Sequence, residues 1–333
     1  MQKIAGDCIQ QIKEIDFNQL EISEYNRQYI HRLLPHLEYY FQTYINALSS
    51  FSSEMQKGQL IVDFGGGHGF LSLFLKSLGY SVIYCDHNPL SVSTITLLKE
   101  KLGFGPDYII EGSSDELNEF CRQNQLIPSR LIATDLIEHV YDLSVFFNEL
   151  KQINSSFEMV FTTGSNPLNF YKCSVLRKEM QKEEKTYLIQ RKEYIENNHS
   201  DLNEIQIQQL AYLTRGKTYS DIQKAVVLFK ETNIYPQPSS DIYNTCAPET
   251  GNWEERILSL KEYQQIAAKE GFQIKFRAGF YNDKRAGFCK SFLSQLLNFF
   301  IKHSGKLGFI FAPYILLHVG KASDKNSLPI ERG

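Results

Sequence analysis

The chain has 333 residues with a formal net charge of −3, and 42% of its residues are hydrophobic and 13% aromatic. This length suits one large α/β domain with an insertion, or two domains. The near-neutral charge argues against a protein that holds long nucleic acid through its phosphates. The six cysteines never form a C-x-x-C pair, which argues against a zinc site or a disulfide framework and predicts reduced, mostly buried thiols.

Residues 1–58 predict a helical cover before the first strand. Charges interrupt the N-terminus too often for a secretory signal, and no apolar run reaches the roughly 20 residues that span a bilayer, so we expect a cytoplasmic protein. Apolar and aromatic side chains then recur about every four residues, as on a helix with one buried face. They are Tyr25, Tyr29, Leu33, Leu37, Phe41 and Ile45.

The segment Leu60–Leu75, LIVDFGGGHGFLSLFL, predicts a buried strand, a glycine turn and the start of a helix. A dinucleotide site requires G-x-G-x-x-G, whereas Phe70 occupies the position of the third glycine here. Asp63, just before the turn, would repel a pyrophosphate but would suit a ligand with an ammonium group. The turn consists of Gly65, Gly66, Gly67 and Gly69, and a purely structural loop is the alternative.

An acid followed by G-x-G-x-G resembles the first motif of the class I S-adenosylmethionine-dependent methyltransferases. The resemblance implies a Rossmann-like, mostly parallel seven-stranded sheet that binds S-adenosyl-L-methionine. The four glycines would approach the methionine part of this cofactor, and Asp63 would help to hold its ammonium group. Helices before the first motif often cover the cofactor in this family. Candidates for that contact are Tyr25, Arg27, Tyr29, His31 and Arg32, and packing is the alternative explanation.

Two further strands end in polar residues at the same predicted edge of the sheet. Asp86 follows the strand Tyr80–Cys85 and would accept hydrogen bonds from both ribose hydroxyls, with His87 beside the adenine. Alternatively, Asp86 caps the helix that begins at Pro89. Many family members carry an acid that meets adenine where this chain has Ser113, so Ser113 either contacts the adenine or caps the next helix.

The segment after the fourth strand, Asp135-Leu136-Ile137-Glu138-His139-Val140, resembles the D-x-x-E-H-V segment of methyltransferases of the ubiquinone-biosynthesis type. The resemblance implies that Asp135 and Leu136 lie along the cofactor and that Glu138 and His139 lie between cofactor and acceptor. His139 is then a candidate general base, with Glu138 as its orienting partner or, as in some relatives, a ligand for a divalent cation. We expect no resident metal. Alternatively, His139 only closes the pocket, because methyl transfer from a sulfonium often needs only alignment.

An insertion of roughly 85 residues follows the fifth strand and separates the core, residues 59–167, from its C-terminal part, residues 258–322. We expect residues 168–257 to form a helical lid over the acceptor site, with Ser220 and Gln223 capping its third helix. The lid residues expected nearest the acceptor are Asn244, Trp253, Arg256 and Arg215. Alternatively, Trp253 and Arg256 anchor the loop to the core.

The C-terminal part contains an unusual apolar helix, Phe288–Ile301, with the sequence FCKSFLSQLLNFFI. Lysines close behind it exclude a membrane span. The helix could make a peripheral membrane contact, dock a second subunit in a homodimer or cover a lipid-like acceptor, and ordinary packing against the sheet is the alternative. Residues 323–333 are expected to form a disordered tail.

Three functions remain open. The first is a methyltransferase for a small-molecule, sugar or lipid-linked acceptor, with oxygen as the favoured acceptor atom. A nucleic acid is not expected as its substrate, because no N-P-P-[YF] motif follows the fourth strand. The second is a non-catalytic S-adenosylmethionine-binding or scaffold protein. The third, an NAD-dependent reductase, is disfavoured because the third dinucleotide glycine and a Tyr-x-x-x-Lys pair are missing.

Overall fold

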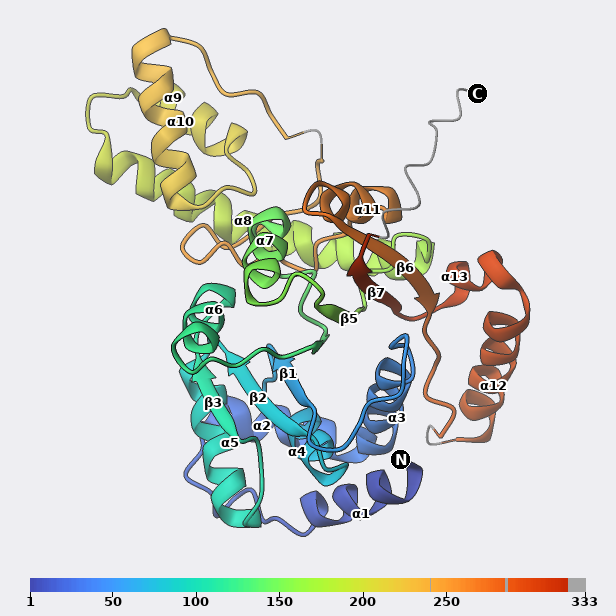
Figure 1. The fold of residues 1–333 in the computed structure, drawn as a ribbon. Coiled ribbons are helices and arrows are strands. Elements are labelled where there is room, and N and C mark those ends of the chain that lie inside the picture. Colours follow the sequence, from blue (N-terminus) through green and yellow to red (C-terminus); the bar gives the residue numbers. More distant parts are fainter. Residues whose placement is uncertain (240, 285–286, 323–333) are drawn as a thin grey trace.

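The computed structural model describes residues 1–239, 241–284 and 287–322, and its centre is one seven-stranded sheet with the strand order β3-β2-β1-β4-β5-β7-β6 (Figure 1). The strands are β1 Leu60–Phe64, β2 Ser81–Asp86, β3 Tyr108–Glu111, β4 Arg130–Thr134, β5 Glu158–Thr163, β6 Phe272–Ala278 and β7 Ile315–Lys321. Pairing is parallel from β3 to β5, and β7 runs antiparallel to both of its neighbours. The predicted fold class is confirmed. The predicted tail, residues 323–333, lies outside the described residues.

The strand order reverses between β1 and β4. The chain winds outwards from β1 through β2 to β3 and then returns to place β4 against the other edge of β1. The connections that leave β1 and β4 therefore diverge at the carboxyl ends of these strands. Open α/β sheets bind their ligands in the crevice at such a point.

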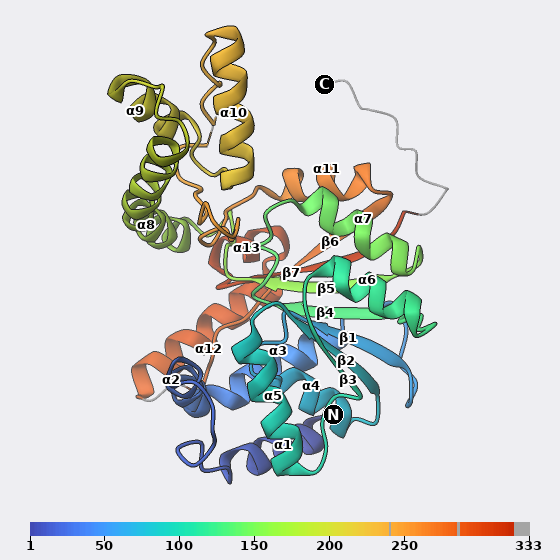
Figure 2. The ribbon, with the colours of Figure 1, turned by 90° about the vertical axis from the view of Figure 1, so that its left-hand side faces the viewer.

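Helices cover both faces of the sheet (Figure 2). One face carries α1 Gln2–Lys13, α3 Leu37–Leu48, α4 Phe70–Ser77 and α5 Pro89–Leu102, and the other carries α6 Ser114–Gln123, α7 Leu143–Ile153 and α11 Leu260–Lys269. The strands between them are apolar on both sides, as Ile61 and Val62 illustrate: they follow each other on β1, belong to the cores on opposite faces and have no exposed surface. This burial on two faces explains why continuous apolar runs marked the strands in the sequence.

The stretch from Tyr25 to Ile45 is divided between two α-helices, where the four-residue spacing predicted one helix with a continuous buried face. Helix α2 Glu24–Leu33 ends at a 3₁₀ turn, η1 Leu34–His36, which contains Pro35. Leu34, the residue before the proline, keeps helical dihedral angles (φ −49°, ψ −43°), and the chain leaves helical geometry at His36 (φ −117°, ψ 9°). Leu37 and Phe41 in α3 are 1% exposed, as predicted, whereas Tyr25 and Tyr29 in α2 are 62% and 37% exposed.

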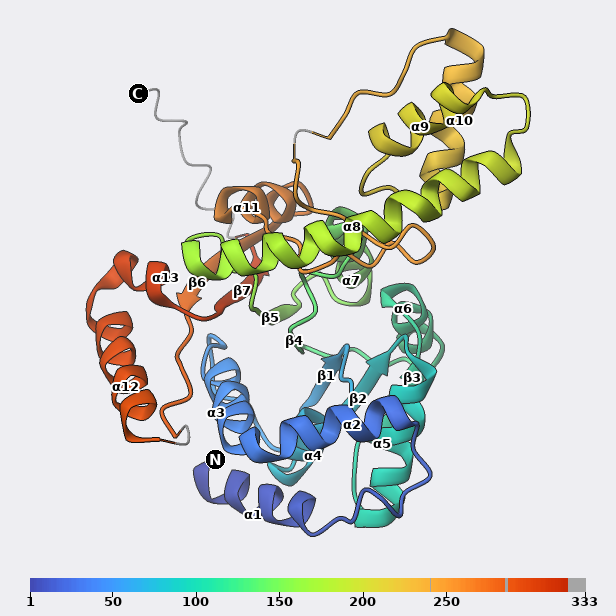
Figure 3. The same cartoon turned by 180° about the vertical axis from the view of Figure 1, so that it is seen from behind.

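The insertion contains three helices with a separate small core. These are α8 Phe170–Asn198, α9 Glu204–Leu213 and α10 Tyr219–Thr232. Ile207, Leu210, Ile222 and Val226 pack together between them. The cap of α10 is Thr218, whose Oγ1 accepts a hydrogen bond from the N–H of Asp221, so the predicted cap at Ser220 and Gln223 is wrong by two residues. Helices α9 and α10 project away from the sheet (Figures 1 and 3).

The C-terminal part adds α12 Phe288–His303, the 3₁₀ turn η2 Gly305–Leu307 and α13 Gly308–Phe311 before β7. Within the described ranges, no helix combines the length and the apolar character needed to cross a membrane. All six cysteines are free, and five of them are buried; the exception is Cys289 on α12. The prediction that most of the thiols are buried is confirmed.

Candidate functional site

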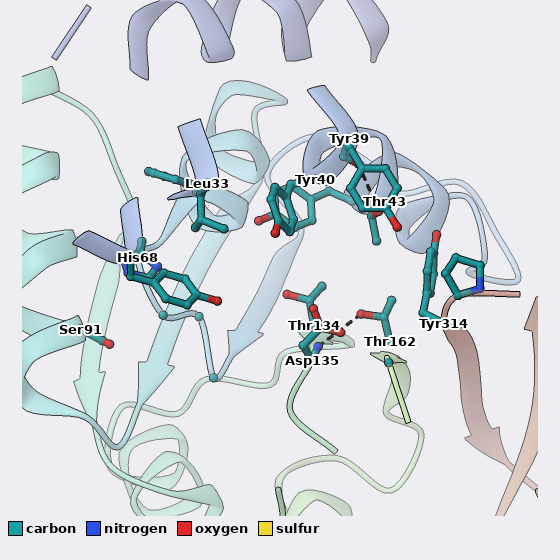
Figure 4. A pocket seen from close by; sticks show the side chains of 18 of the residues that line it. Leu33, Tyr39, Tyr40, Thr43, His68, Ser91, Thr134, Asp135, Thr162 and Tyr314 are labelled. Carbon is teal, nitrogen blue, oxygen red and sulfur yellow. Dashed lines mark hydrogen bonds between the residues drawn. The ribbon is translucent and has the colours of Figure 1, made fainter. Parts of the chain in front are cut away.

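A cavity of about 680 Å³ opens at the carboxyl ends of β1, β4 and β5, at the point where the strand order reverses (Figure 4). The turn Gly65–Gly67 borders it after β1, Thr134 and Asp135 after β4, and Thr162 and Gly164 after β5. Helices α2 and α3 close one side, and Tyr281 and Tyr314 come from the C-terminal part.

The backbone conformation and the close packing of the glycine turn exclude residues with side chains at two positions. Gly65 and Gly69 have φ values of +64° and +76°, in the left-handed region. A Cβ atom on Gly65 would lie 1.9 Å from Leu136 Cδ1, and one on Gly69 would lie 2.1 Å from Ile95 Cδ1. The structure therefore brings Gly65 and Leu136, two predicted cofactor residues, into contact, and the backbone of the turn faces the cavity.

Asp86 fixes this turn from the end of β2. Its Oδ2 accepts the N–H of Gly67 at 2.8 Å and its Oδ1 accepts the N–H of Asn88 at 2.8 Å. The hydroxyl of Tyr84 donates to the carbonyl oxygen of Gly67 at 2.6 Å. Each carboxylate oxygen keeps a lone pair for a ligand hydroxyl. Asp86 is 7% exposed and borders the turn but is not itself among the residues that line the cavity. His87 Nδ1 lies 3.9 Å from Asp86 Oδ1, and the His87 side chain is 65% exposed and also does not line the cavity.

Asp63 lies beneath the turn. Its side chain is 1% exposed, and its Oδ2 accepts a hydrogen bond from Ser72 Oγ at 2.6 Å. Burial raises the pKa of Asp63 to about 7; the Ser72 hydrogen bond opposes this rise and the charge of Asp86 adds to it. A cation near the turn would stabilise the ionised form of this carboxyl group.

Asp135 and Glu138, which follow β4, both lie close enough to Glu255 for its charge to affect their pKa values. Burial, and then the charge of Glu255, raise the pKa of Asp135 to about 6, whereas Lys172 lowers it. Burial, and then the charges of Asp135 and Glu255, raise the pKa of Glu138 well above its ordinary value. Glu138 Oε1 accepts the N–H of Gly164 at 3.2 Å, while its Oε2 is buried without a partner in the described part of the chain. The buried surroundings of Glu138 therefore favour the protonated form of its carboxyl group. Among the described residues, no cluster of three or more metal-binding side chains is present.

The structure places His139 outside the cavity lining. Its Nδ1 lies 2.7 Å from the carbonyl oxygen of Trp253, so Nδ1 carries the proton and Nε2 is the basic atom. Nε2 lies 4.0 Å from Glu255 Oε1, and the side chain is 40% exposed. Glu138 and His139 contact different partners, and Glu255 is the acid nearest the histidine.

Of the four predicted acceptor residues, Trp253 and Arg256 join the loop of the insertion to the core, whereas Asn244 and Arg215 make hydrogen bonds within the insertion. Trp253 Nε1 donates to the carbonyl oxygen of Tyr141 at 3.1 Å, and the Arg256 guanidinium lies 4.3 Å from the Trp253 ring centre. Asn244 exchanges hydrogen bonds with the backbone of Ile257, and Arg215 donates to the carbonyl oxygen of Asn244 at 3.1 Å. None of the four lines the cavity. The contacts of Trp253 and Arg256 therefore match the alternative prediction, that these two residues anchor the loop to the core. Helices α9 and α10 also extend away from the core, and only the first turn of α8 reaches the cavity, through Tyr171 and Lys172.

Ser113 caps α6 in a capping box with Glu116. Of its two predicted roles, adenine contact or helix cap, the structure shows the cap. Most of the aromatic lining of the cavity was not predicted from the sequence. Eight tyrosines border the cavity: Tyr25, Tyr29, Tyr39, Tyr40, Tyr44, Tyr171, Tyr281 and Tyr314. His68 stacks on Tyr29 at a centroid distance of 4.6 Å, and burial lowers its pKa to about 4, so it is neutral. The Tyr39–Tyr40 pair in an amphipathic helix was the available signal, but burial in the core explained it equally well.

No protein-family model and no curated protein matches the sequence. Solved structures are similar at low identity. They include phosphoethanolamine N-methyltransferase 2 from Haemonchus contortus (TM-score 0.42, 13% identity, 85% of this chain and 53% of that chain) and magnesium protoporphyrin IX methyltransferase from Synechocystis PCC 6803 (TM-score 0.39, 12% identity, 86% and 84%). A third is a SAM-dependent methyltransferase from Archaeoglobus fulgidus (TM-score 0.38, 11% identity, 86% and 93%). The chain thus spans about half the length of the Haemonchus protein.

Proposed function

We propose that the protein is an S-adenosyl-L-methionine-dependent methyltransferase. The observation that carries the proposal is the turn Gly65–Gly67, which Asp86 holds open at the strand-order reversal beside a cavity of about 680 Å³. The site presents acids where a dinucleotide site presents a bare helix N-terminus to pyrophosphate. Asp63 and Asp86 suit a ligand that combines an ammonium group with ribose hydroxyls.

In this proposal the cofactor supplies a methyl group on a positively charged sulfur, and the protein supplies alignment. The backbone of Gly65, Gly66, Gly67 and Gly69 borders the amino-acid part of the cofactor, Asp63 stabilises its ammonium charge, and Asp86 accepts the ribose hydroxyls. Leu136 and Asp135 lie along the cofactor. The tyrosines exclude water and hold the acceptor near the methyl group, which favours direct displacement.

A hydroxyl acceptor loses a proton when it takes the methyl group. Asp135 is the ionisable carboxyl group that the cavity lining offers, and its raised pKa of about 6 suits a proton acceptor near neutral pH. His139, the candidate from the sequence, has a basic Nε2 but lies outside the lining. We therefore rank Asp135 above His139 as the base and assign Glu138, which is buried, to holding Gly164.

The proposed acceptor is a small molecule, a sugar or a lipid-linked compound, methylated at oxygen, and the proposed compartment is the cytoplasm. Nucleic acid is not proposed as a substrate, since the net charge of the chain is −3. Asn244, Trp253, Arg256 and Arg215 would act on the acceptor only through the position of the loop. Helix α12 is proposed as a contact surface, for either a membrane or a second subunit.

Calorimetric titration tests the cofactor class. We expect S-adenosylhomocysteine to bind with micromolar affinity, NADH not to bind, and Asp86→Ala to remove the binding. A matched control is Asp142→Ala, which removes the cap of α7 and leaves the cavity lining intact. Binding of NADH in place of S-adenosylhomocysteine would favour the reductase. Binding of S-adenosylhomocysteine without methyl transfer to any acceptor pool would favour a non-catalytic binding protein.

A further inference from the structure

Helix α12 turns its more apolar face to solvent. Leu293, Leu296, Phe299 and Phe300 are 55%, 42%, 59% and 49% exposed, and with Cys289 they recur at the three- and four-residue spacing of one helix face. The opposite face packs on the protein through a mixture of apolar and polar residues, and Ile301 on it is 8% exposed. Ser294 is 4% exposed, and Asn298 exchanges hydrogen bonds of 2.7 Å and 2.9 Å with the backbone of Tyr281. This orientation is the reverse of that of a helix that covers a core.

The charged residues of α12 and of the segment that follows it are all basic. Residues 284–312 contain four lysines and one arginine but no aspartate or glutamate, although the whole chain has a net charge of −3. Lys290, Lys302 and Lys306 are exposed and form no ion pair in the part of the chain that the structure describes, whereas Lys284 pairs with Glu38. Lys290 and Lys302 flank the apolar stripe on either side, at helical spacing.

The apolar surface continues beyond α12 toward the cavity. Leu307 and Phe311, on the turn and short helix that follow, are 62% and 44% exposed. The Asn166 side chain donates to the carbonyl oxygens of Phe309 and Ala312 at 2.8 Å and 2.9 Å, which ties this segment to the start of α8. There Phe170 and Tyr171 are 75% and 78% exposed, and Tyr171 lines the cavity. Helix α12 lies at an edge of the molecule away from α9 and α10 (Figures 1 and 3).

We infer that α12 and the segment that follows it dock on an anionic membrane surface, with the helix lying in the plane of the headgroups. Apolar side chains would enter the acyl boundary, and Lys290, Lys302 and Lys306 would meet anionic headgroups. The positive charge of this surface argues against a second copy of the chain as its binding partner, because a dimer would bring two cationic segments together. If the proposed methyl transfer holds, this placement favours a lipid-linked acceptor, which would enter past Tyr171 and Tyr281.

The test uses the full-length protein and no cofactor, so its result does not depend on the proposed methyl transfer. Because Cys289 is the exposed cysteine and the other five are buried, a thiol-reactive, polarity-sensitive fluorophore labels α12 selectively. We expect its emission to shift to the blue with vesicles of phosphatidylcholine and phosphatidylglycerol, and to stay unchanged with phosphatidylcholine alone. Sedimentation of the unlabelled protein with the same vesicles gives the partition coefficient.

Two variants separate the contribution of the apolar side chains to membrane binding from that of the lysines. Phe299→Glu should reduce partitioning at least about tenfold, because it removes an apolar side chain from the contact. Lys302→Gln with Lys306→Gln should reduce it about 25-fold, from about fivefold for each lysine near an anionic surface. Leu228→Glu, at a residue 56% exposed on α10, is the matched control and should bind like the wild type. Circular dichroism verifies that each variant is folded.

Absence of binding to anionic vesicles by the folded wild-type protein would overturn the inference. Equal binding by Phe299→Glu and the wild type would overturn it too, because the apolar face would then play no part. Light scattering provides the third outcome. A dimer that Phe299→Glu dissociates, with no vesicle binding, would assign the face to a second copy instead.

Discussion

Asp63→Asn is expected to stabilise the unliganded protein at alkaline pH while it weakens cofactor binding. The Asp63 carboxyl group is 1% exposed beneath the glycine turn and accepts a hydrogen bond from Ser72 Oγ at 2.6 Å. Burial raises its pKa from 3.8 to about 7. The protein thus keeps a carboxyl group where its ionised form is destabilised, which agrees with the proposed role of Asp63 beside the ammonium group of a ligand.

The sign of the effect follows from proton linkage. The unfolded chain releases this proton near pH 3.8, whereas the folded protein holds it until about pH 7, so the folded state binds more protons between these values. The contribution of Asp63 to the free energy of unfolding is therefore complete below about pH 4 and is lost as the pH rises toward 8, by about 4 kcal/mol in total. Asparagine does not ionise and lacks this loss. Its altered hydrogen bond with Ser72 costs on the order of 1 kcal/mol at every pH.

Urea unfolding at pH 5 and pH 8 measures the effect. The free energy of unfolding of Asp63→Asn, relative to that of the wild type, should be higher at pH 8 than at pH 5 by about 3 kcal/mol. Asp7→Asn, at an exposed position of α1, is the control for surface charge and should show no such difference. A relative stability of Asp63→Asn that stays constant within about 0.5 kcal/mol between the two pH values would refute the reasoning.

Three further predictions concern other parts of the site. Gly65→Ala should lower the free energy of unfolding in urea by about 1–3 kcal/mol and abolish S-adenosylhomocysteine binding, because the new Cβ would meet Leu136 Cδ1. Adding Leu136→Ala to this variant should restore part of the stability. Asp135→Asn should lower kcat for a hydroxyl acceptor by about 10²–10⁴-fold and His139→Ala by less than about tenfold; the reverse order in steady-state assays would make His139 the base. Arg191→Met breaks a buried ion pair with Glu184 and should therefore speed hydrogen exchange in α8 to α10. Cofactor binding, measured by calorimetry, should stay unchanged. Loss of that binding would contradict the separation of the insertion from the cavity.

The strands and the glycine turn that borders the cavity were predictable because their signals are local. A buried parallel strand leaves a continuous apolar run, and a tight turn leaves glycines, so β1, β2, β4 and β5 and the turn at Gly65–Gly67 follow from short segments. Asp86 was found because it stands at the end of its strand. Asp135, predicted through the resemblance, also lies at the cavity.

The acceptor side was not predictable from local patterns. Tyr40, Tyr281 and Tyr314 lie far apart in the sequence and meet only because α3 packs beside the ends of β6 and β7. Trp253 drew attention as the only tryptophan, but a large aromatic residue can anchor a loop as well as it can bind a ligand. The direction in which the insertion projects depends on its own core around Ile222, which periodicity does not reveal.

The central claim is that the site transfers methyl groups. The most direct measurement is the transfer of labelled methyl from S-adenosyl-L-methionine into small molecules and lipids extracted from cells, catalysed by the purified protein with Asp86→Ala as the control. The account predicts that label enters an extractable acceptor with the wild type and not with the variant. A folded wild-type protein that binds S-adenosylhomocysteine but transfers no label to either fraction would contradict it.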